Sequence, residues 1–428
     1  MHSFLPLIIL SLGLFAFIAW HRLTYAFALF CFLLPTYLIR FSIGPIPSTF
    51  LEGMLWILSI ITLIHHSRSK EERRLTTTRV ISLVQHHRSL LLASTLFLLA
   101  ATIAVFASSH TRAALGEWKA FYVEPILFCF LLFVTIRTKK DVYLLISALL
   151  LSGFLTSSFA IYQHFTGFMV PYAFWENRHT YRVTAWYGFP NAVGLFLAPL
   201  FPLAILFLTQ WKKQIPSAYR VLSLLFLPTA LLAILYAKST GALMGVVAST
   251  GLLSLWWKKT RWPALVLGVF GIGILCFLPP HHPIRQELFM QDRSGQIRID
   301  MWGETVEYLF AHPIFGAGLA SYRTEIYPYR IDKWIEVFHH PHNIFLTMWV
   351  NLGILGLISF TWMLVWFTRT AYHVRQHPMV PFVFASMGSL LTTGLVDSPY
   401  IKNDLSILFW ILPALLLILS LIPSNDSV

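Results

Sequence analysis

The chain has 428 residues, of which 57% are hydrophobic and only 11% are charged, and its mean hydropathy is +0.68. A soluble domain carries roughly 25% charged residues, so the composition excludes a soluble globular protein and indicates a membrane protein with many spans. The net charge is +13. In a membrane protein, basic residues in cytoplasmic loops explain such an excess better than a nucleic-acid partner, and we expect no nucleic acid.

Thirteen apolar segments are candidate transmembrane helices, and several have about 17 residues, the short end of what crosses roughly 30 Å of hydrocarbon. Twelve spans are equally acceptable, because only three residues separate the first two segments. In chain order the segments are 4–20, 24–39, 50–65, 90–107, 120–136, 142–162, 191–209, 221–237, 241–257, 263–279, 343–367, 380–396 and 405–422. The sequence therefore predicts an all-α, polytopic membrane protein of about 12–13 transmembrane helices.

Five basic connections between these segments would all lie on one side of the membrane, which the positive-inside rule assigns to the cytoplasm. They contain Arg68, Lys70, Arg73, Arg74, Arg79, Arg88, Arg137, Lys139, Lys140, Lys212, Lys213, Arg220, Lys258, Lys259, Arg261, Arg369 and Arg375. We expect one integral membrane domain with three parts. These are N-terminal transmembrane helices over 1–279, a large outer loop over 280–342 and C-terminal transmembrane helices over 343–428.

The outer connections carry cations that the positive-inside rule does not explain. They are Arg178, Arg182, Lys238, Arg285, Arg293, Arg298, Arg323, Arg330 and Lys333. The large loop also holds eight acidic residues, so each cation could be solvated or paired. An anionic ligand is the other interpretation.

Within the large loop, residues 298–310 have the pattern of an amphipathic helix at the membrane surface. Their apolar residues follow a helical spacing, and Asp300, Glu304 and Glu307 occupy the other face. The sequence Gly316-Ala317-Gly318 predicts a tight turn after this helix, because glycine tolerates positive φ.

The sequence His340-Pro341-His342-Asn343 stands where this loop meets the next apolar segment. With Pro341 opening a helix, His342 would lie in its first turn, where the helix dipole favours a neutral imidazole, a competent general base. Asn343 could orient a sugar or phosphate. Alternatively, Asn343 or His340 merely caps the helix. His339, His340 and His342 could also bind a metal, but three histidines within four residues do not share one face, and we expect no metal.

Arginine binds phosphate oxygens with two parallel hydrogen bonds and keeps its charge. Arg182 and Arg298 come from different loops, and together with a histidine they could hold a diphosphate. Singly, each could equally be a surface residue. Asp397 ends an apolar segment on the outer side. It could pair with Arg298 or orient His342, or it could be a solvated acid at a helix end.

The region 298–357 resembles the O-antigen ligase superfamily, which includes O-antigen ligases, O-antigen polymerases and some protein O-oligosaccharyltransferases. An arginine precedes Trp302, and the sequence 312–318 is similar to the family's HP-x-x-G-x-G turn. His342-Asn343 is followed, after nine residues, by Gly353-x-x-Gly356, as in the family's histidine motif. The layout is similar too, and upstream Arg182 followed by Pro190-Asn191 resembles the family's R…PN stretch.

The resemblance implies about a dozen helices in the inner (plasma) membrane, with an active site on the outer, periplasmic or extracytoplasmic, face. It implies an enzyme that transfers a glycan from a polyprenyl-diphosphate carrier to a hydroxyl of a lipid, glycan or protein acceptor, with inversion and without metal or cofactor. His342 would be the base, and Arg182 and Arg298 would bind the diphosphate. Asn343, His340 and Asp397 would support them. Membrane lipids would be the other partners.

One position departs from the family. Family members have Ser-Arg-Gly-Ala at the outer start of a span, whereas this chain has Thr240 in place of that arginine. Lys238, two residues earlier, would supply the lost cation. The alternative function is a transporter or flippase of lipid-linked glycan, which would place ionisable groups near the membrane centre. Glu124 is the main residue that fits it. A structural or signalling membrane protein is a third possibility, and the sequence does not separate ligase from polymerase.

Overall fold

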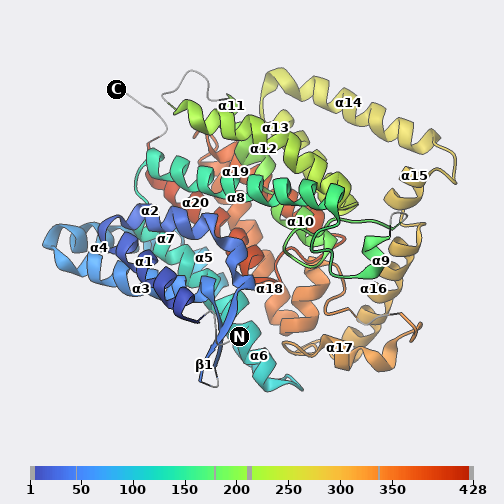
Figure 1. The fold of residues 1–428 in the computed structure, drawn as a ribbon, viewed down its shortest axis with the longest axis horizontal. Coiled ribbons are helices and arrows are strands. Elements are labelled where there is room, and N and C mark those ends of the chain that lie inside the picture. Colours follow the sequence, from blue (N-terminus) through green and yellow to red (C-terminus); the bar gives the residue numbers. More distant parts are fainter. Residues whose placement is uncertain (1–4, 45, 178–179, 210–214, 336–337, 424–428) are drawn as a thin grey trace.

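The computed structural model describes residues 5–44, 46–177, 180–209, 215–335 and 338–423. Arg178, Lys212 and Lys213, which figured in the charge analysis, lie outside these residues. Helices dominate the described chain, and its strands form one antiparallel hairpin of β1 (Arg40–Ile43) and β2 (Ile46–Thr49). Figure 1 shows the helices packed side by side in one bundle, with the large loop along one edge.

Nine helical segments of the described chain are long and apolar enough to cross a membrane. They are α3 (Phe50–Arg68), α5 (Arg88–Phe106), the continuous stretch of α6 (Thr111–Glu117), a π-helix (Trp118–Val123) and α7 (Glu124–Thr135), α8 (Lys139–Thr166), the pair α10 (Pro190–Leu197) and α11 (Leu200–Thr209), α12 (Ser217–Tyr236), α14 (Lys258–Phe277), α18 (Ile344–His373) and α20 (Asn403–Leu421). Four shorter apolar helices are α1 (Leu5–His21), α2 (Leu23–Phe32), α13 (Thr240–Trp256) and α19 (Val380–Gly394). The prediction of an all-α polytopic membrane protein is confirmed.

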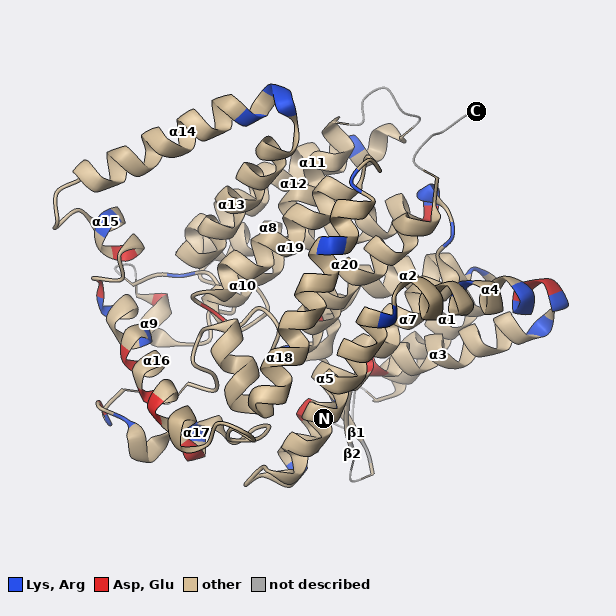
Figure 2. Cartoon of the chain, turned by 180° about the vertical axis from the view of Figure 1, so that it is seen from behind, with Lys and Arg blue, Asp and Glu red and all other residues tan. Residues whose placement is uncertain are grey.

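Two N-terminal predictions were wrong in detail. The second predicted span, 24–39, is α-helical only over the ten residues of α2, about 15 Å at 1.5 Å per residue. Pro35 falls in the 3₁₀-helix Leu34–Leu38, and the chain then enters the hairpin. The basic connection 65–89 is not a loop, because it contains α4 (Lys70–His86), whose N-cap Ser69 accepts a hydrogen bond from the Glu72 N–H. In Figure 2 the basic residues of α4 lie at one end of the bundle.

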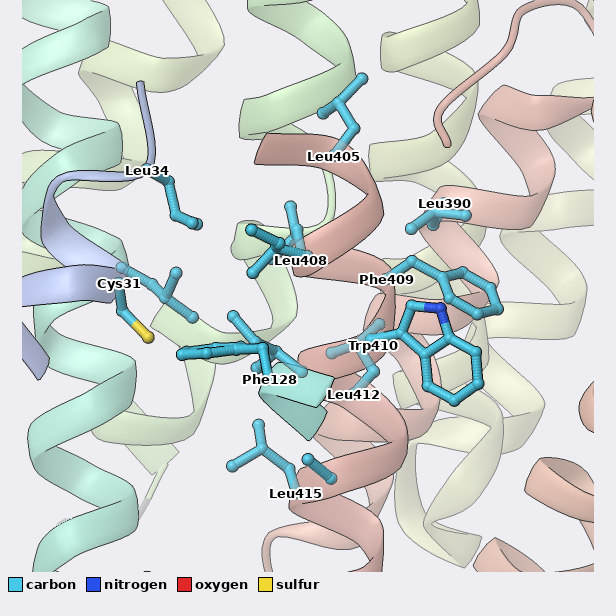
Figure 3. Packing of buried hydrophobic residues seen from close by; sticks show 14 of the residues in the cluster. Cys31, Leu34, Phe128, Leu390, Leu405, Leu408, Phe409, Trp410, Leu412 and Leu415 are labelled. Carbon is cyan, nitrogen blue, oxygen red and sulfur yellow. The ribbon is translucent and has the colours of Figure 1, made fainter. Parts of the chain in front are cut away.

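The bundle is held together by helices from both ends of the chain. Helix α18 packs on α5, α20 on α7, and α19 on α13. Helix α20 is buried along nearly its whole length, and Figure 3 shows its Leu408 and Leu412 in the same buried cluster as Cys31 of α2 and Phe128 of α7. A helix that is hydrophobic all round belongs in the centre of a bundle, as α20 does. Helix α14, by contrast, has no buried residue and stands at the edge.

The large loop contains α15 (Pro283–Leu288), α16 (Arg293–Ala311), α17 (Tyr322–Glu325) and a 3₁₀-helix (Tyr327–Tyr329), and a short α9 (Ala173–Glu176) precedes α10. Helix α16 starts five residues before the predicted helix, because Asp292 caps it. We expected the polar face of this helix to be solvated, but part of it is buried. Glu304 is buried and accepts a hydrogen bond from the Ile331 N–H at 2.8 Å, since the end of the loop folds back over it.

Two sequence motifs of the family resemblance form one contact. Helix α18 is broken at Gly353, whose φ of 69° is left-handed. Two backbone groups of α18 that lose their helical partner at this break bond instead to the 312–318 turn. Val350 O accepts from Ala317 N at 2.6 Å, and Ile354 N donates to Ile314 O at 3.1 Å. In an unbroken helix these two groups of α18 would bond to each other. The predicted tight turn is present, with positive φ at Gly316 and Gly318, and it docks the loop onto α18.

Candidate functional site

The sequence predicted that His342 lies in the first turn of α18. In the structure, His342 instead precedes this helix. Asn343 is the N-cap, and its side-chain oxygen accepts hydrogen bonds from Phe345 N and Leu346 N at 3.0 and 3.1 Å. Asparagine is among the best N-cap residues, which explains why the helix starts after Asn343 and not at Pro341. The Asn343 amide nitrogen donates to Leu395 O at 3.1 Å. Both ends of this side chain are therefore used by the protein itself.

The backbone of His342 is left-handed, with φ 49°. This conformation is unfavourable for a residue with a Cβ and occurs mainly where neighbouring structure enforces it, often at functional sites. The neighbour on one side is Trp302 of α16, whose indole N–H donates to Pro341 O at 2.8 Å. The conformation turns His342 away from the helix and toward the segment that follows α19.

His342 meets Asp397 there. The distance from His342 Nδ1 to Asp397 Oδ1 is 2.9 Å, and Asp397 is only 7% exposed. The interpretation of Asp397 as a solvated acid at a helix end is therefore wrong. A carboxylate on Nδ1 favours the tautomer that carries its proton there, which leaves Nε2 as a hydrogen-bond acceptor.

Asp397 is held as a carboxylate by several groups. Burial alone would raise the pKa of Asp397, but the charge of His342 and the hydrogen bonds from His342 and Ser398, together with the charge of Arg298, hold it well below its usual range. Its Oδ1 also accepts from Ser398 N at 2.8 Å, and its Oδ2 accepts from the Asn191 amide at 2.7 Å. A negative carboxylate in this position would stabilise an imidazolium when one forms on His342.

Asn191 joins this pair to Arg182. One Arg182 Nη donates to Asn191 Oδ1 at 2.7 Å and to Lys238 O at 3.1 Å, while its Nε donates to Ala237 O at 2.8 Å. Burial, followed by the nearby charge of Arg298, lowers the pKa of Arg182 to about 10. The guanidinium therefore stays charged at neutral pH. The sequence pointed to Arg182 and Pro190-Asn191 only as a motif, and the structure shows that one contacts the other.

Arg298 reaches the same place from α16. Its Nε donates to Val396 O at 2.9 Å, next to Asp397, and its Nη1 donates to Ser294 Oγ at 2.9 Å. Arg182 and Arg298 are close enough for each charge to act on the other. The charges of Asp397 and Glu287 also act on Arg182, and two guanidinium groups held this close together suit an anionic ligand.

The remaining predicted site residues take different places. Lys238 has an exposed side chain and a left-handed backbone, with φ 48°, and its carbonyl is the part that meets Arg182. Thr240 hydrogen-bonds through its hydroxyl to Glu287 of α15. Burial, with the charges of His342 and His339 adding to it, lowers the pKa of His340 to about 3, so it is neutral at pH 7.

In the described part of the chain, the group of histidines and acids spaced for a metal ion is His65, His66 and Glu72, at the turn between α3 and α4. Arg137 already pairs with Glu72 there, with Nη2 to Oε2 at 2.7 Å. The histidines before α18 are not part of this group.

Sequence reasoning did not single out Lys402, which precedes α20 five residues after Asp397. Its ammonium lies near Tyr187 and Phe189, in the connection that carries Arg182. The signal in the sequence was weak, because a lone lysine at a helix start resembles any surface residue. Only the fold of the chain brings it beside the others.

Comparison with known proteins points to the family that the motifs resemble. Residues 224–361 match the family model described as O-antigen ligase. A protein of Rickettsia conorii that carries the provisional name of a polysaccharide ligase is 36% identical over 73 residues, which are 16% of this chain and 18% of that protein. The match thus spans less than a fifth of the relative's length. The matched family region includes Arg298, the 312–318 turn, His342 and Gly353-x-x-Gly356. The family model and this relative thus agree with the motifs that carry the resemblance to the O-antigen ligase superfamily.

Proposed function

We propose that this membrane protein transfers a glycan from a polyprenyl-diphosphate carrier to an acceptor hydroxyl, with His342 as general base. The family supports a glycan-transferring function of the ligase or polymerase type. The single observation that carries the finer proposal is the continuous chain of contacts from Arg182 through Asn191 and Asp397 to His342. It links a cation suited to phosphate with a histidine suited to proton removal.

In the proposed reaction, His342 Nε2 removes the proton from the acceptor hydroxyl as its oxygen attacks the anomeric carbon. Asp397 holds the ring through Nδ1 and stabilises the imidazolium that forms. General-base assistance is typically worth 10²–10⁴-fold in rate. Because attack comes from the face opposite the leaving group, the anomeric configuration inverts.

The bond that breaks joins the anomeric carbon to the diphosphate oxygen, and polyprenyl diphosphate leaves with both electrons of that bond. Negative charge then grows on the leaving oxygen. Arg182 and Arg298 are fixed by backbone and side-chain hydrogen bonds before the ligand arrives, so they stabilise this charge without reorganising. Neither the base nor the cations require a metal or another cofactor in this scheme.

We place the reaction on the outer face of the inner (plasma) membrane. The basic connections near α4, before α8 and at the start of α14 support this orientation through the positive-inside rule. His342 precedes α18, and the basic residues Arg369 and Arg375 lie at the opposite end of that helix. The acceptor hydroxyl could belong to a lipid, a glycan or a protein.

Purified full-length protein in liposomes, supplied with a polyprenyl-diphosphate oligosaccharide and a candidate acceptor, tests the proposal. We expect polyprenyl diphosphate to be released in proportion to glycosylated acceptor, and NMR of the product to show an inverted anomeric centre. Retention of configuration would contradict the single-displacement scheme. Product formation that depends on the protein but leaves the carrier linkage intact would contradict transfer from the diphosphate.

A transporter of lipid-linked glycan is the second candidate, and two buried acids favour it. Glu124 is 2% exposed and Asp404 is fully buried, both in spanning segments, where ionisable groups often mark transport paths. The same liposomes separate the two functions. Movement of the donor between leaflets without release of polyprenyl diphosphate would favour transport.

A further inference from the structure

Lys402 is carried on a rigid stretch of backbone beside the candidate site. Its N–H donates to Tyr400 O at 2.9 Å. The hydroxyl of the fully buried Tyr400 donates to Phe121 O at 2.8 Å and accepts from Trp410 Nε1 at 3.0 Å. The start of the Lys402 side chain is therefore fixed relative to α20.

The ammonium of Lys402 reaches toward the connection that holds Arg182. Its Nζ lies 5.8 Å from the ring centroid of Tyr187 and 5.6 Å from that of Phe189. These distances are within the range of cation–π attraction. Phe189 is two residues before Asn191, which bonds to both Arg182 and Asp397. The two rings thus hold a third cation on the side of the site where Arg182 lies.

Within the described residues, no carboxylate lies within 4.0 Å of this ammonium, and it makes no hydrogen bond. Burial lowers the pKa of Lys402, while the more distant charges of Asp404 and Asp397 partly offset that effect. Lys402 is partly buried, and an ammonium that loses part of its water without gaining a direct partner is unfavourable. A phosphate oxygen would supply the missing acceptor.

The sequence suggested Lys238 as a further cation of this site, because Thr240 stands where family members have an arginine. Thr240 stands at the position of the family's arginine and bonds to Glu287. Lys238 is exposed, and its carbonyl, not its ammonium, contacts Arg182. Among the described residues, Lys402 is a further cation that lies near both Asp397 and the Arg182 connection.

We propose that Lys402 binds the donor's diphosphate as the third cation of the site, in place of the arginine that Thr240 replaces. This inference rests on the proposed function. Lysine donates three hydrogen bonds from a compact charge, so it can serve either phosphate of the ligand. Arg182 and Arg298 would bind the other oxygens with their planar guanidinium groups.

The test measures binding of two probes, undecaprenyl diphosphate and the uncharged undecaprenol, to the purified full-length protein in detergent. Lys402→Met should weaken binding of the diphosphate about tenfold, the loss of one charge-assisted hydrogen bond, and leave binding of the alcohol unchanged. Lys402→Arg should keep most of the affinity. Lys333→Met is the matched control, because Lys333 is an exposed cation 5.8 Å from the ring of Tyr327, and it should bind both probes as the wild type does.

Equal affinity of Lys402→Met and wild type for the diphosphate would overturn the role of Lys402 and leave the proposed function standing. A wild-type protein that binds the diphosphate no better than the alcohol would overturn the proposed function, and this inference with it. Equal losses for both probes would mean a structural role only, which also contradicts the proposal. A phosphorylated glycolipid without a polyprenyl chain is the third probe, and a loss confined to it would assign Lys402 to the acceptor instead. If Lys402→Met does not fold, the comparison of Lys402→Gln with Lys402→Arg decides in the same way.

Discussion

His342 Nδ1 and Asp397 Oδ1 lie 2.9 Å apart although 55 residues separate them in the chain. The contact joins the start of α18 to the segment between α19 and α20. It gives the histidine a fixed orientation and a fixed tautomer, and its partner carboxylate is itself fixed by Asn191 and Ser398. The account of this protein as a glycan transferase depends on this pair.

Replacing Asp397 should reduce turnover much more than donor binding. Asp397→Asn keeps the shape but removes the charge that stabilises an imidazolium, and it can present an amide N–H to His342 Nδ1, favouring the wrong tautomer. In a serine protease the equivalent change lowers kcat about 10⁴-fold, and we expect at least about 10²-fold here. Asp300→Asn is the control for the loss of one carboxylate, because Asp300 is exposed on α16. A normal kcat in Asp397→Asn would contradict the orienting role.

Trp302 should act on the reaction through the backbone next to His342. Trp302→Phe keeps most of the packing and removes the hydrogen bond to Pro341 O. Because that bond restrains the residue before the left-handed His342, its loss should lower kcat several-fold, roughly what one neutral hydrogen bond of about 1 kcal/mol provides. The KM for the donor should change little. Steady-state kinetics in liposomes separate the two parameters, and a change in KM alone would point to a donor contact instead.

Gly353 should tolerate no side chain. A Cβ at this position would collide with Ile314 O, and φ is 69°, a region that costs other residues about 1–2 kcal/mol even without a collision. We expect Gly353→Ala to lower the thermal unfolding midpoint in detergent by several degrees and to increase proteolysis of the large loop. Gly268→Ala on α14, where a Cβ meets open space, is the matched control and should be neutral or slightly stabilising. Equal midpoints for the two variants would contradict the docked turn.

Acid should destabilise the fold partly through Asp397. The folded-state pKa of Asp397 is lowered relative to an unfolded value of about 3.9. The ionised carboxylate therefore contributes stability above about pH 4, and this contribution is lost as the pH falls toward the folded pKa. Between about pH 5 and pH 3, the unfolding midpoint of the wild type should fall more steeply than that of Asp397→Asn. Parallel curves would mean that folding does not lower the pKa of Asp397.

Hydropathy predicted the helices well, since burial in lipid or in a bundle needs long apolar runs whichever neighbours a helix has. It failed where local chemistry interrupts a run. The α-helix of the second segment ends before Pro35, which lies in a 3₁₀-helix, and the hairpin after it has no strong alternation to reveal it. Helix α4 escaped notice because a charged amphipathic helix outside the bundle resembles a loop by composition.

The residue types of the site could be predicted from the sequence, but the contacts between these residues could not. The motifs pointed to Arg182, Arg298 and His342, and the structure brings the three around Asp397. His342 contacts its carboxylate, Arg182 bonds to Asn191, which contacts Asp397, and Arg298 bonds to the carbonyl of the preceding Val396. Whether Asp397 is solvated depends on what packs over it, which one sequence does not encode locally. The position of His342 was wrong by one helix turn, because Asn343 is a stronger cap than Pro341 is a helix start.

Glycan transfer by His342 variants tests the central claim most directly. Two variants are needed, His342→Ala and His342→Asn, because asparagine tolerates the left-handed backbone better than alanine does. His339→Ala, an exposed histidine three residues away, is the control. Our account predicts folded proteins that still bind undecaprenyl diphosphate, with transfer lowered about 10²–10⁴-fold in both His342 variants and unchanged in His339→Ala. Wild-type rates in both His342 variants would contradict it.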